Sequence, residues 1–211
     1  SSLLTGTSYS FRAYLFNGTT YIYGDVLTFT TNNATIIAQQ DFEMSPASPV
    51  LTFANTNGGF ISGTNSGGLP ADANLFSGGA RGWIANNVTS TVTFANVSVS
   101  SFQNVYLNFR LAGFSFNSTG NGIDAADIVT VSVSVDGGAT YSSELTIAGS
   151  AANQAWDFTA TGSAEITYDG NNSPSAFTSS SGSAGISDVT INLPSNITQV
   201  RVRISMLNNS A

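Results

Sequence analysis

The sequence contains no cysteine, no histidine and no lysine. Without cysteine the chain has no disulfide and no thiol chemistry. Without histidine it has neither a Ser-His-Asp triad nor an imidazole zinc site, and without lysine it cannot form a Schiff base. Five arginines stand against twelve acidic residues, which gives a net charge of -7. Proteins that bind nucleic acids use lysine and arginine to displace counterions from the phosphates. This chain has few such cations, so we expect no nucleic-acid partner.

Long apolar runs are also missing, and charged residues make up only 8% of the chain. No stretch approaches the roughly 20 apolar residues of a membrane span, so we expect no membrane insertion. Serine, threonine, asparagine and glycine take the place of the missing charges, and they suit turns and solvent-facing strand positions. Hydrophobic residues still account for 41% of the 211 residues, which is enough for a core without disulfides.

Apolar and polar residues alternate along several runs, among them 106–111, 129–135 and 200–206. A period of two predicts strands with one buried and one solvent-facing side, as in antiparallel sheets. No segment has a helical period. Asn17-Gly18 and Asp136-Gly137-Gly138 lie between alternating runs and predict hairpin turns. The expected fold class is therefore all-β, an antiparallel β-sandwich.

The first 31 residues form a pattern of their own. They contain Leu3, Tyr9, the run Ser10-Phe11-Arg12-Ala13-Tyr14, the turn Asn17-Gly18, and the run Tyr21-Ile22-Tyr23-Gly24-Asp25 before residues 26–31. This string resembles the last two strands of a fibronectin type III domain. The resemblance implies that Tyr9 is a tyrosine-corner residue whose hydroxyl bonds back to nearby backbone. We expect residues 1–32 to be a partial unit of this type, in the form of a β-hairpin.

The remaining residues, 33–211, resemble a second family. The residues that carry this likeness are 37–43, 107–112, 120–138 and 203–210. They are similar to jelly-roll or lectin-like β-sandwich modules of large secreted proteins of the Bacteroidetes group. The resemblance implies a jelly-roll-like sandwich in a bacterial protein that is secreted or lies at the cell surface. Such modules continue into a closing strand with Trp and a pair of Asp, so we expect this one to be truncated before its last strand.

Two pairs of carboxylates are candidate calcium ligands. Asp124 and Asp127 follow a Gly-Asn-Gly turn that could add carbonyl oxygens, and calcium takes six to eight oxygens. Asp41 and Glu43 are expected on the first strand of the sandwich, where alternation places them on one face. Calcium near terminal strands is also a feature that the jelly-roll resemblance implies. The alternative for Asp124 and Asp127 is that they form a turn by bonding to local backbone.

The segment 134–141 resembles the Asp-box, a hairpin motif of the form Ser-X-Asp-X-Gly-X-Thr-aromatic that is found in sialidases. The matching residues are Ser134, Asp136, Gly138, Thr140 and Tyr141, with Tyr in the place usually given to Trp. In that family the motif is structural. The resemblance therefore implies that Ser134 and Asp136 hold the turn and that the Tyr141 ring packs beneath it.

The two tryptophans are candidate ligand-binding residues. Trp83 lies near Asn86, and Trp156 is followed by Asp157. An exposed aromatic ring stacks on the C–H face of a sugar, and neighbouring amides and carboxylates take its hydroxyl groups. The alternative for both tryptophans is packing in the core.

The expected function is that of a non-catalytic module in a secreted modular surface protein, in adhesion or carbohydrate binding. Its partners would be carbohydrates or other surface protein domains. An alternative is a structural or assembly module that contacts other domains, or copies of itself, through strand edges. A third alternative is a fragment of a polysaccharide-degrading enzyme, for which only three glutamates and nine aspartates could act. None of these lies in a catalytic signature, so no enzyme activity is expected.

Overall fold

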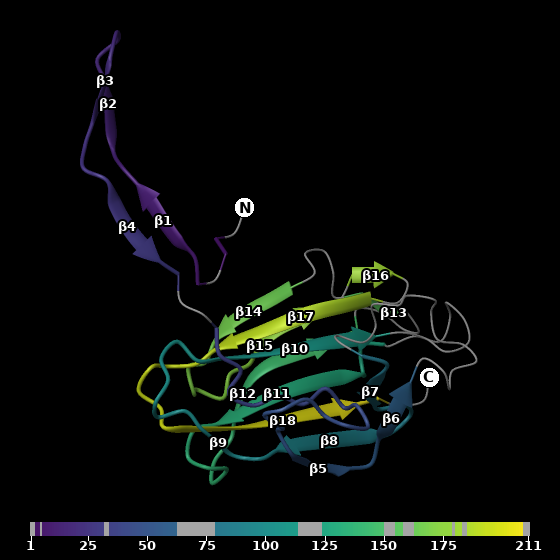
Figure 1. The fold of residues 1–211 in the computed structure, drawn as a ribbon. Coiled ribbons are helices and arrows are strands. Elements are labelled where there is room, and N and C mark those ends of the chain that lie inside the picture. Colours follow the sequence, from purple (N-terminus) through teal and green to yellow (C-terminus); the bar gives the residue numbers. More distant parts are fainter. Residues whose placement is uncertain are drawn as a thin grey trace. The chain divides into compact units, whose positions relative to one another are not determined.

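The computed structural model describes residues 3–4, 6–31, 34–62, 79–113, 124–149, 155–157, 163–178, 180–182 and 185–208. Within these ranges the chain is all-β, without a helix and with mostly antiparallel sheets (Figure 1), which confirms the expected fold class. This part of the chain accordingly has no helix with the length and apolarity needed to cross a membrane. The chain divides into two compact units, residues 1–36 and 37–211.

The first unit is a long hairpin in two segments. β1 (Ser8–Phe11) pairs with β4 (Leu27–Thr30), and β2 (Tyr14–Phe16) pairs with β3 (Tyr21–Tyr23), both antiparallel. The turn forms where predicted, because the Asn17 side-chain oxygen accepts the backbone N–H groups that follow it.

The Tyr9 hydroxyl lies near the start of the hairpin. It accepts the backbone N–H of Leu4 over 2.7 Å. The Tyr9 ring also stacks on Phe29 across the ladder, with the ring centroids 5.7 Å apart. The hydroxyl therefore makes the backbone contact that the tyrosine-corner resemblance implied.

The second unit contains a larger sheet with the strand order β15-β12-β11-β18-β8-β5, and β9 also pairs with β18. Its strands are β5 (Phe53–Thr56), β8 (Thr89–Phe94), β9 (Val97–Ser98), β11 (Ile128–Ser134), β12 (Ser142–Ala148), β15 (Ser175–Thr178) and β18 (Gln199–Leu207). The hairpin predicted at Asp136-Gly137-Gly138 connects β11 to β12, and both glycines have positive φ angles. β15 joins β12 in parallel, unlike the other ladders of this sheet.

A smaller sheet has the order β10-β17-β14. β10 (Tyr106–Gly113) is antiparallel to β17 (Gly185–Asn192), which is parallel to β14 (Ser163–Thr167). Two further ribbons complete the described strands. They are β6 (Gly59–Ser62) with β7 (Arg81–Ile84), and β13 (Ala155–Asp157) with β16 (Ser180–Gly182).

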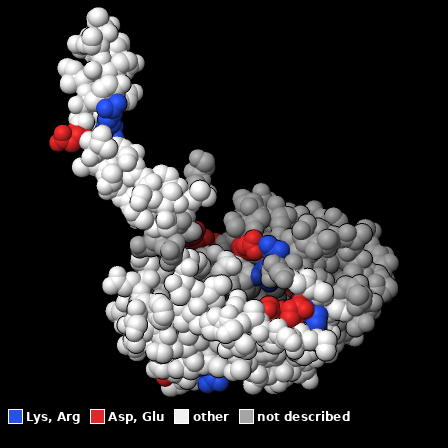
Figure 2. Space-filling model, viewed as in Figure 1, with Lys and Arg blue, Asp and Glu red and all other residues white. Residues whose placement is uncertain are grey.

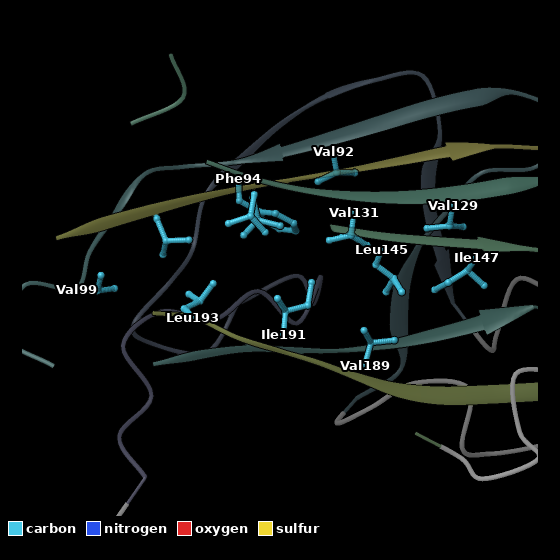
Figure 3. Packing of buried hydrophobic residues seen from close by; sticks show 13 residues of the cluster. Val92, Phe94, Val99, Val129, Val131, Leu145, Ile147, Val189, Ile191 and Leu193 are labelled. Carbon is cyan, nitrogen blue, oxygen red and sulfur yellow. The ribbon is translucent and has the colours of Figure 1, made fainter. Parts of the chain in front are cut away.

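The core lies between the two sheets. Val131 and Leu145 of the larger sheet and Val189 and Ile191 of the smaller sheet are fully buried. Figure 3 shows these side chains facing one another from the two sheets, so the sheets are the layers of a sandwich. Each such side chain contributes about 1.5–3 kcal/mol when it is fully buried. The smaller sheet is thereby held as a rigid layer, with its other face turned away from the core.

Candidate functional site

The face of the smaller sheet that turns away from the core carries a row of polar side chains on each strand. Leu107 and Phe109 of β10 pack against the core, so the residues that alternate with them point to the opposite side. The pairing of β17 with both neighbours brings the three rows together. We define the outer face by Tyr106, Asn108, Arg110, Glu165, Thr167, Asp188, Thr190 and Asn192.

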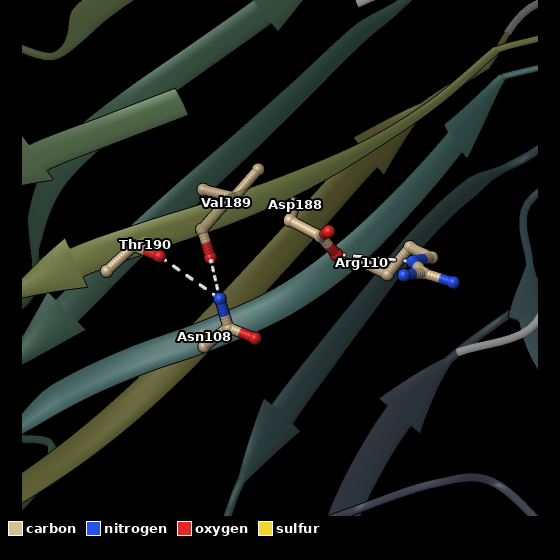
Figure 4. A network of polar contacts seen from close by, with 5 residues as sticks. All are labelled: Asn108, Arg110, Asp188, Val189 and Thr190. Carbon is tan, nitrogen blue, oxygen red and sulfur yellow. Dashed lines mark hydrogen bonds and ion pairs between the residues drawn. The ribbon is translucent and has the colours of Figure 1, made fainter. Parts of the chain in front are cut away.

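Hydrogen bonds between neighbouring strands order this face. The Asn108 side-chain amide donates to the Thr190 hydroxyl and to the Val189 carbonyl over 3.1 and 3.3 Å. The Arg110 Nε donates to Asp188 Oδ1 over 3.2 Å. Figure 4 shows both contacts, with Asn108 Oδ1 pointing away from them. These contacts hold donors and acceptors at fixed positions on a rigid layer, which favours recognition of a polar ligand.

Glu165 belongs to the same network. Its Oε1 accepts the side-chain amide of Asn192 over 2.7 Å. The carboxylates of Glu165 and Asp188 are therefore both engaged, one by an amide and one by a guanidinium group. The side chains of Arg110 and Asp188 are 27% and 50% exposed, so their ion pair orients the two groups and adds at most about 1 kcal/mol to stability.

The outer face also offers an aromatic ring. Tyr106 is 52% exposed and lies at one end of β10, beside Asn192 of β17 in the ladder. On the side of the molecule drawn in Figure 2, acidic and basic side chains lie next to each other near the middle of the second unit, among neutral side chains. An exposed ring next to amides and a carboxylate combines an apolar contact with hydrogen bonds, as sugar binding requires.

Two of the residues predicted from sequence to bind a ligand, Trp156 and Asp157, lie on β13. This strand contacts both β10 and β17 of the smaller sheet. Their backbones pair with Ser181 and Ser180 of β16. The fold thus brings the element that carries these two residues next to the strands that carry the outer face.

The other tryptophan, Trp83, has a packing role. Its ring lies 5.1 to 6.3 Å from the rings of Phe42, Phe53 and Phe60, centroid to centroid. Its Nε1 donates to the buried hydroxyl of Ser90 over 3.1 Å. The alternative interpretation of Trp83 as a packing residue therefore agrees with the structure, because its ring packs against other aromatic rings. Its predicted companion Asn86 is exposed in the turn between β7 and β8.

Asp124 and Asp127, the first predicted calcium pair, form a turn. Asp124 Oδ1 accepts the N–H of Ala126 over 2.7 Å, and Asp127 Oδ2 accepts the N–H of Asp124 over 2.9 Å. These bonds are the ones expected from the alternative interpretation, in which the two residues form a turn by bonding to local backbone. Across the described ranges there is no group of three or more acidic, histidine or cysteine residues arranged to hold a metal.

The second predicted calcium pair, Asp41 and Glu43, does not lie on a strand, so the predicted placement on the first strand of the sandwich is wrong. Phe42 between them has a φ of 59°, which breaks the alternation of an extended chain. Asp41 accepts the N–H groups of Glu43 and Ala47. These two backbone bonds, that of Ala47 first, hold the pKa of Asp41 below its ordinary value.

Glu43 instead ties its segment to the start of β7. Its Oε1 accepts the N–H groups of Ala80 and Arg81 over 2.7 and 2.8 Å. A Cβ on Gly79 would clash with the same oxygen, so a larger residue there would displace the Glu43 side chain. Both carboxylates of the pair therefore satisfy backbone donors.

The 134–141 hairpin has the internal bonds expected for its motif. Ser134 donates its hydroxyl to Asp136 over 2.6 Å, and the N–H of Gly138 donates to the same hydroxyl. Thr140 donates both its N–H and its hydroxyl to Asp136. The hydroxyl groups of Ser134 and Thr140 hold the pKa of Asp136 well below its ordinary value. Tyr141 packs under the guanidinium of Arg203, which lies 3.7 Å from the ring centroid.

The sequence reasoning did not select the outer face as a site, although it placed residues 106–111 in a half-buried strand. The alternation there predicts that Tyr106, Asn108 and Arg110 face solvent, which is the only sequence signal for the site. Their partners on β17 lie about 80 residues away in sequence, since Arg110 bonds Asp188 across a separation of 78. Comparison with known proteins gives no match to a family model, to a curated protein or to a solved structure.

Proposed function

We propose that this chain is a non-catalytic carbohydrate-binding module of a secreted or cell-surface protein, and that the outer face of the smaller sheet is its contact surface. The observation that carries the proposal is the exposed Tyr106 ring, which shares this face with two ordered polar contacts. These contacts are the hydrogen bond from Asn108 to Thr190 and the Arg110–Asp188 ion pair. A sugar ring stacks on tyrosine through its C–H groups. Its hydroxyl groups bond to amides, carboxylates and guanidinium groups.

The composition of the outer face favours a neutral glycan. Its one cation, Arg110, is already paired with Asp188, and the whole chain carries a net charge of -7. A strongly anionic polysaccharide would be repelled by such a chain, because like charges raise the cost of association.

The test is binding to a panel of neutral and anionic polysaccharides by affinity electrophoresis and glycan array, with the whole 211-residue chain. Tyr106→Ala should weaken binding about tenfold or more, because an aromatic ring that stacks on the ligand in a small interface contributes at least about 1.4 kcal/mol. Tyr21→Ala is the matched control, since Tyr21 is an equally exposed tyrosine of the first unit. Equal loss in both variants, or no loss in Tyr106→Ala, contradicts the proposal.

The non-catalytic part of the proposal has its own assay. Release of new reducing ends from any bound polysaccharide should be absent, since Glu165 and Asp188 are held by Asn192 and Arg110 and the chain contains no histidine. Product formation that disappears in Glu165→Gln or Asp188→Asn would overturn the non-catalytic assignment.

A second function, contact with another protein domain, is favoured by the first unit. Its two-stranded ribbon exposes large apolar side chains, such as Leu15 and Ile22, which are 65% and 57% exposed and lie opposite each other in the ladder. Isolated ribbons of this kind are marginally stable, and clustered exposed apolar side chains are typical of interaction surfaces. Light scattering over a concentration series tests self-association, and the double variant Leu15→Ser, Ile22→Ser should abolish it.

A further inference from the structure

Glu144 is an extra residue in the ladder between β11 and β12. Val131 lies opposite Leu145, whereas the next residue, Ser132, lies opposite Ser143, so Glu144 has no partner in β11. Such a β-bulge bends the strand and redirects a side chain, and bulges are frequent next to functional sites. Glu144 is only 4% exposed, which is unusual for a charged side chain.

One oxygen of this buried carboxylate is unsatisfied. Glu144 Oε2 accepts the N–H of Asp169 over 3.2 Å. Glu144 Oε1 is buried and has no hydrogen-bond partner among the residues that the structure describes. A buried carboxylate oxygen without a donor is costly, and buried charges in native proteins are normally paired or coordinate a metal. Oε1 belongs to the same carboxylate as Oε2, whose donor Asp169 lies in the 168–172 turn.

The turn beside Glu144, residues 168–172, is firmly attached to β12. The N–H of Asn172 donates to the Ser142 hydroxyl, and the N–H of Ser143 donates to the Asn172 side chain, both over 2.9 Å. Gly170 and Asn172 have φ angles of 70° and 59°, so two residues of the turn are in the left-handed region. The side-chain oxygens of Asn171 and Asn172 also lie at this turn, where they accept the N–H groups of Ser173 and Ser143.

The turn also concentrates negative charge. The Asp169 carboxylate accepts the N–H and the side-chain amide of Asn171 over 3.0 and 2.6 Å. The Asp169 N–H also bonds to Glu144 Oε2, so two acidic residues meet at this turn.

We propose that a calcium ion binds here, between the Glu144 carboxylate on the bulge and the 168–172 turn. Glu144 Oε1 and the Asp169 carboxylate would supply the charged ligands. Carbonyl and amide oxygens of the turn and water would supply the rest, because calcium takes six to eight oxygens in flexible geometry. Magnesium fits less well, since it demands a small octahedral site and gives up its water reluctantly. The proposed site shares no ligand with the outer face or with the Asp124–Asp127 turn.

The experiment is titration of calcium chloride into the chelator-treated 211-residue chain, by calorimetry and by thermal unfolding in parallel. Extracellular modules bind calcium with dissociation constants of about 0.1–1 mM. At 10 mM calcium the unfolding midpoint should then rise by about 3–10 °C, whereas 10 mM magnesium should raise it by less. Glu144→Gln should abolish the binding heat and the shift. Without calcium, this variant should be at least as stable as the wild type, because an uncompensated buried charge is removed.

Two matched controls locate the ion. Glu165→Gln changes a glutamate of the smaller sheet, and Asp124→Asn changes the other candidate pair; both should bind calcium like the wild type. Asp169→Asn should weaken binding at least tenfold, and it serves as the test if Glu144→Gln does not fold. The proposal is overturned if the wild type shows neither heat nor shift. It is equally overturned if Glu144→Gln retains both, or if Asp124→Asn alone loses them.

Discussion

Replacement of Trp83 by alanine distinguishes a packing tryptophan from a ligand-binding one. The ring lies among Phe42, Phe53 and Phe60, and its indole N–H bonds to Ser90. Phe53 in turn contacts Phe94 of the core, with the ring centroids 6.2 Å apart. Truncation at Trp83 should therefore loosen the contact between the β6–β7 ribbon and the core.

The magnitude follows from burial. A fully buried aromatic side chain costs about 3–5 kcal/mol when it is cut to alanine. Trp83 is partly buried, so we expect about 2–4 kcal/mol from urea unfolding, with an unchanged m-value. For a chain of this size the unfolding midpoint falls by about 2–4 °C for each kcal/mol, which gives a total of about 4–16 °C.

Trp83→Phe separates the ring from its hydrogen bond. The ring contacts remain, while the bond to the Ser90 hydroxyl is lost, and that hydroxyl keeps its bond to the Asn57 carbonyl. The cost should be about 1 kcal/mol from the lost bond, plus a smaller packing loss. If Trp83→Ala leaves the urea midpoint unchanged but abolishes glycan binding, the packing assignment is refuted and the ligand-binding prediction is restored.

Three further predictions concern local features. Leu145→Ala should cost about 2–5 kcal/mol in urea unfolding, because Leu145 is fully buried, and Thr146→Ala on the same strand should cost less. The lowered pKa of Asp136 stabilises the folded chain at pH values above 3.8, the ordinary pKa of this carboxyl group. This stabilisation is lost as the pH falls through the pKa of the folded state, and Asp136→Asn should flatten this acid dependence of the unfolding midpoint in thermal scans. Tyr9→Phe should speed hydrogen exchange of the Leu4 amide, measured by NMR, and unchanged exchange would contradict the bond to the Tyr9 hydroxyl.

The parts of the fold that depend on short-range pattern could be predicted from sequence. Alternation over 106–111, 129–135 and 200–206 located the strands that the structure has at 106–113, 128–134 and 199–207, because each has one face against the core. The bonds of the 134–141 hairpin were also predictable, because Ser134, Asp136 and Thr140 bond within a few residues of one another.

The candidate sites depend on register, which sequence alone does not define. Asn108 meets Thr190 only because β10 pairs with β17 in one particular register. Glu144 leaves the ladder only because β12 has one residue more than β11 opposite it. The positive φ of Phe42 is a further example, since an apolar aromatic residue gives no local signal for that conformation.

The strand order has a consequence for the way this chain acquires its structure. β17 is the middle strand of the smaller sheet, and β18 joins β11 to β8 in the larger one, yet both follow all the other described strands in sequence. A nascent chain that ends before residue 185 can close the β11–β12 hairpin, but neither sheet is continuous. Closing contacts between residues such as 89 and 207 is entropically slow. The earlier strands therefore keep unpaired edges until residues 185–207 are added, and partial chains that lack these residues should be prone to aggregate.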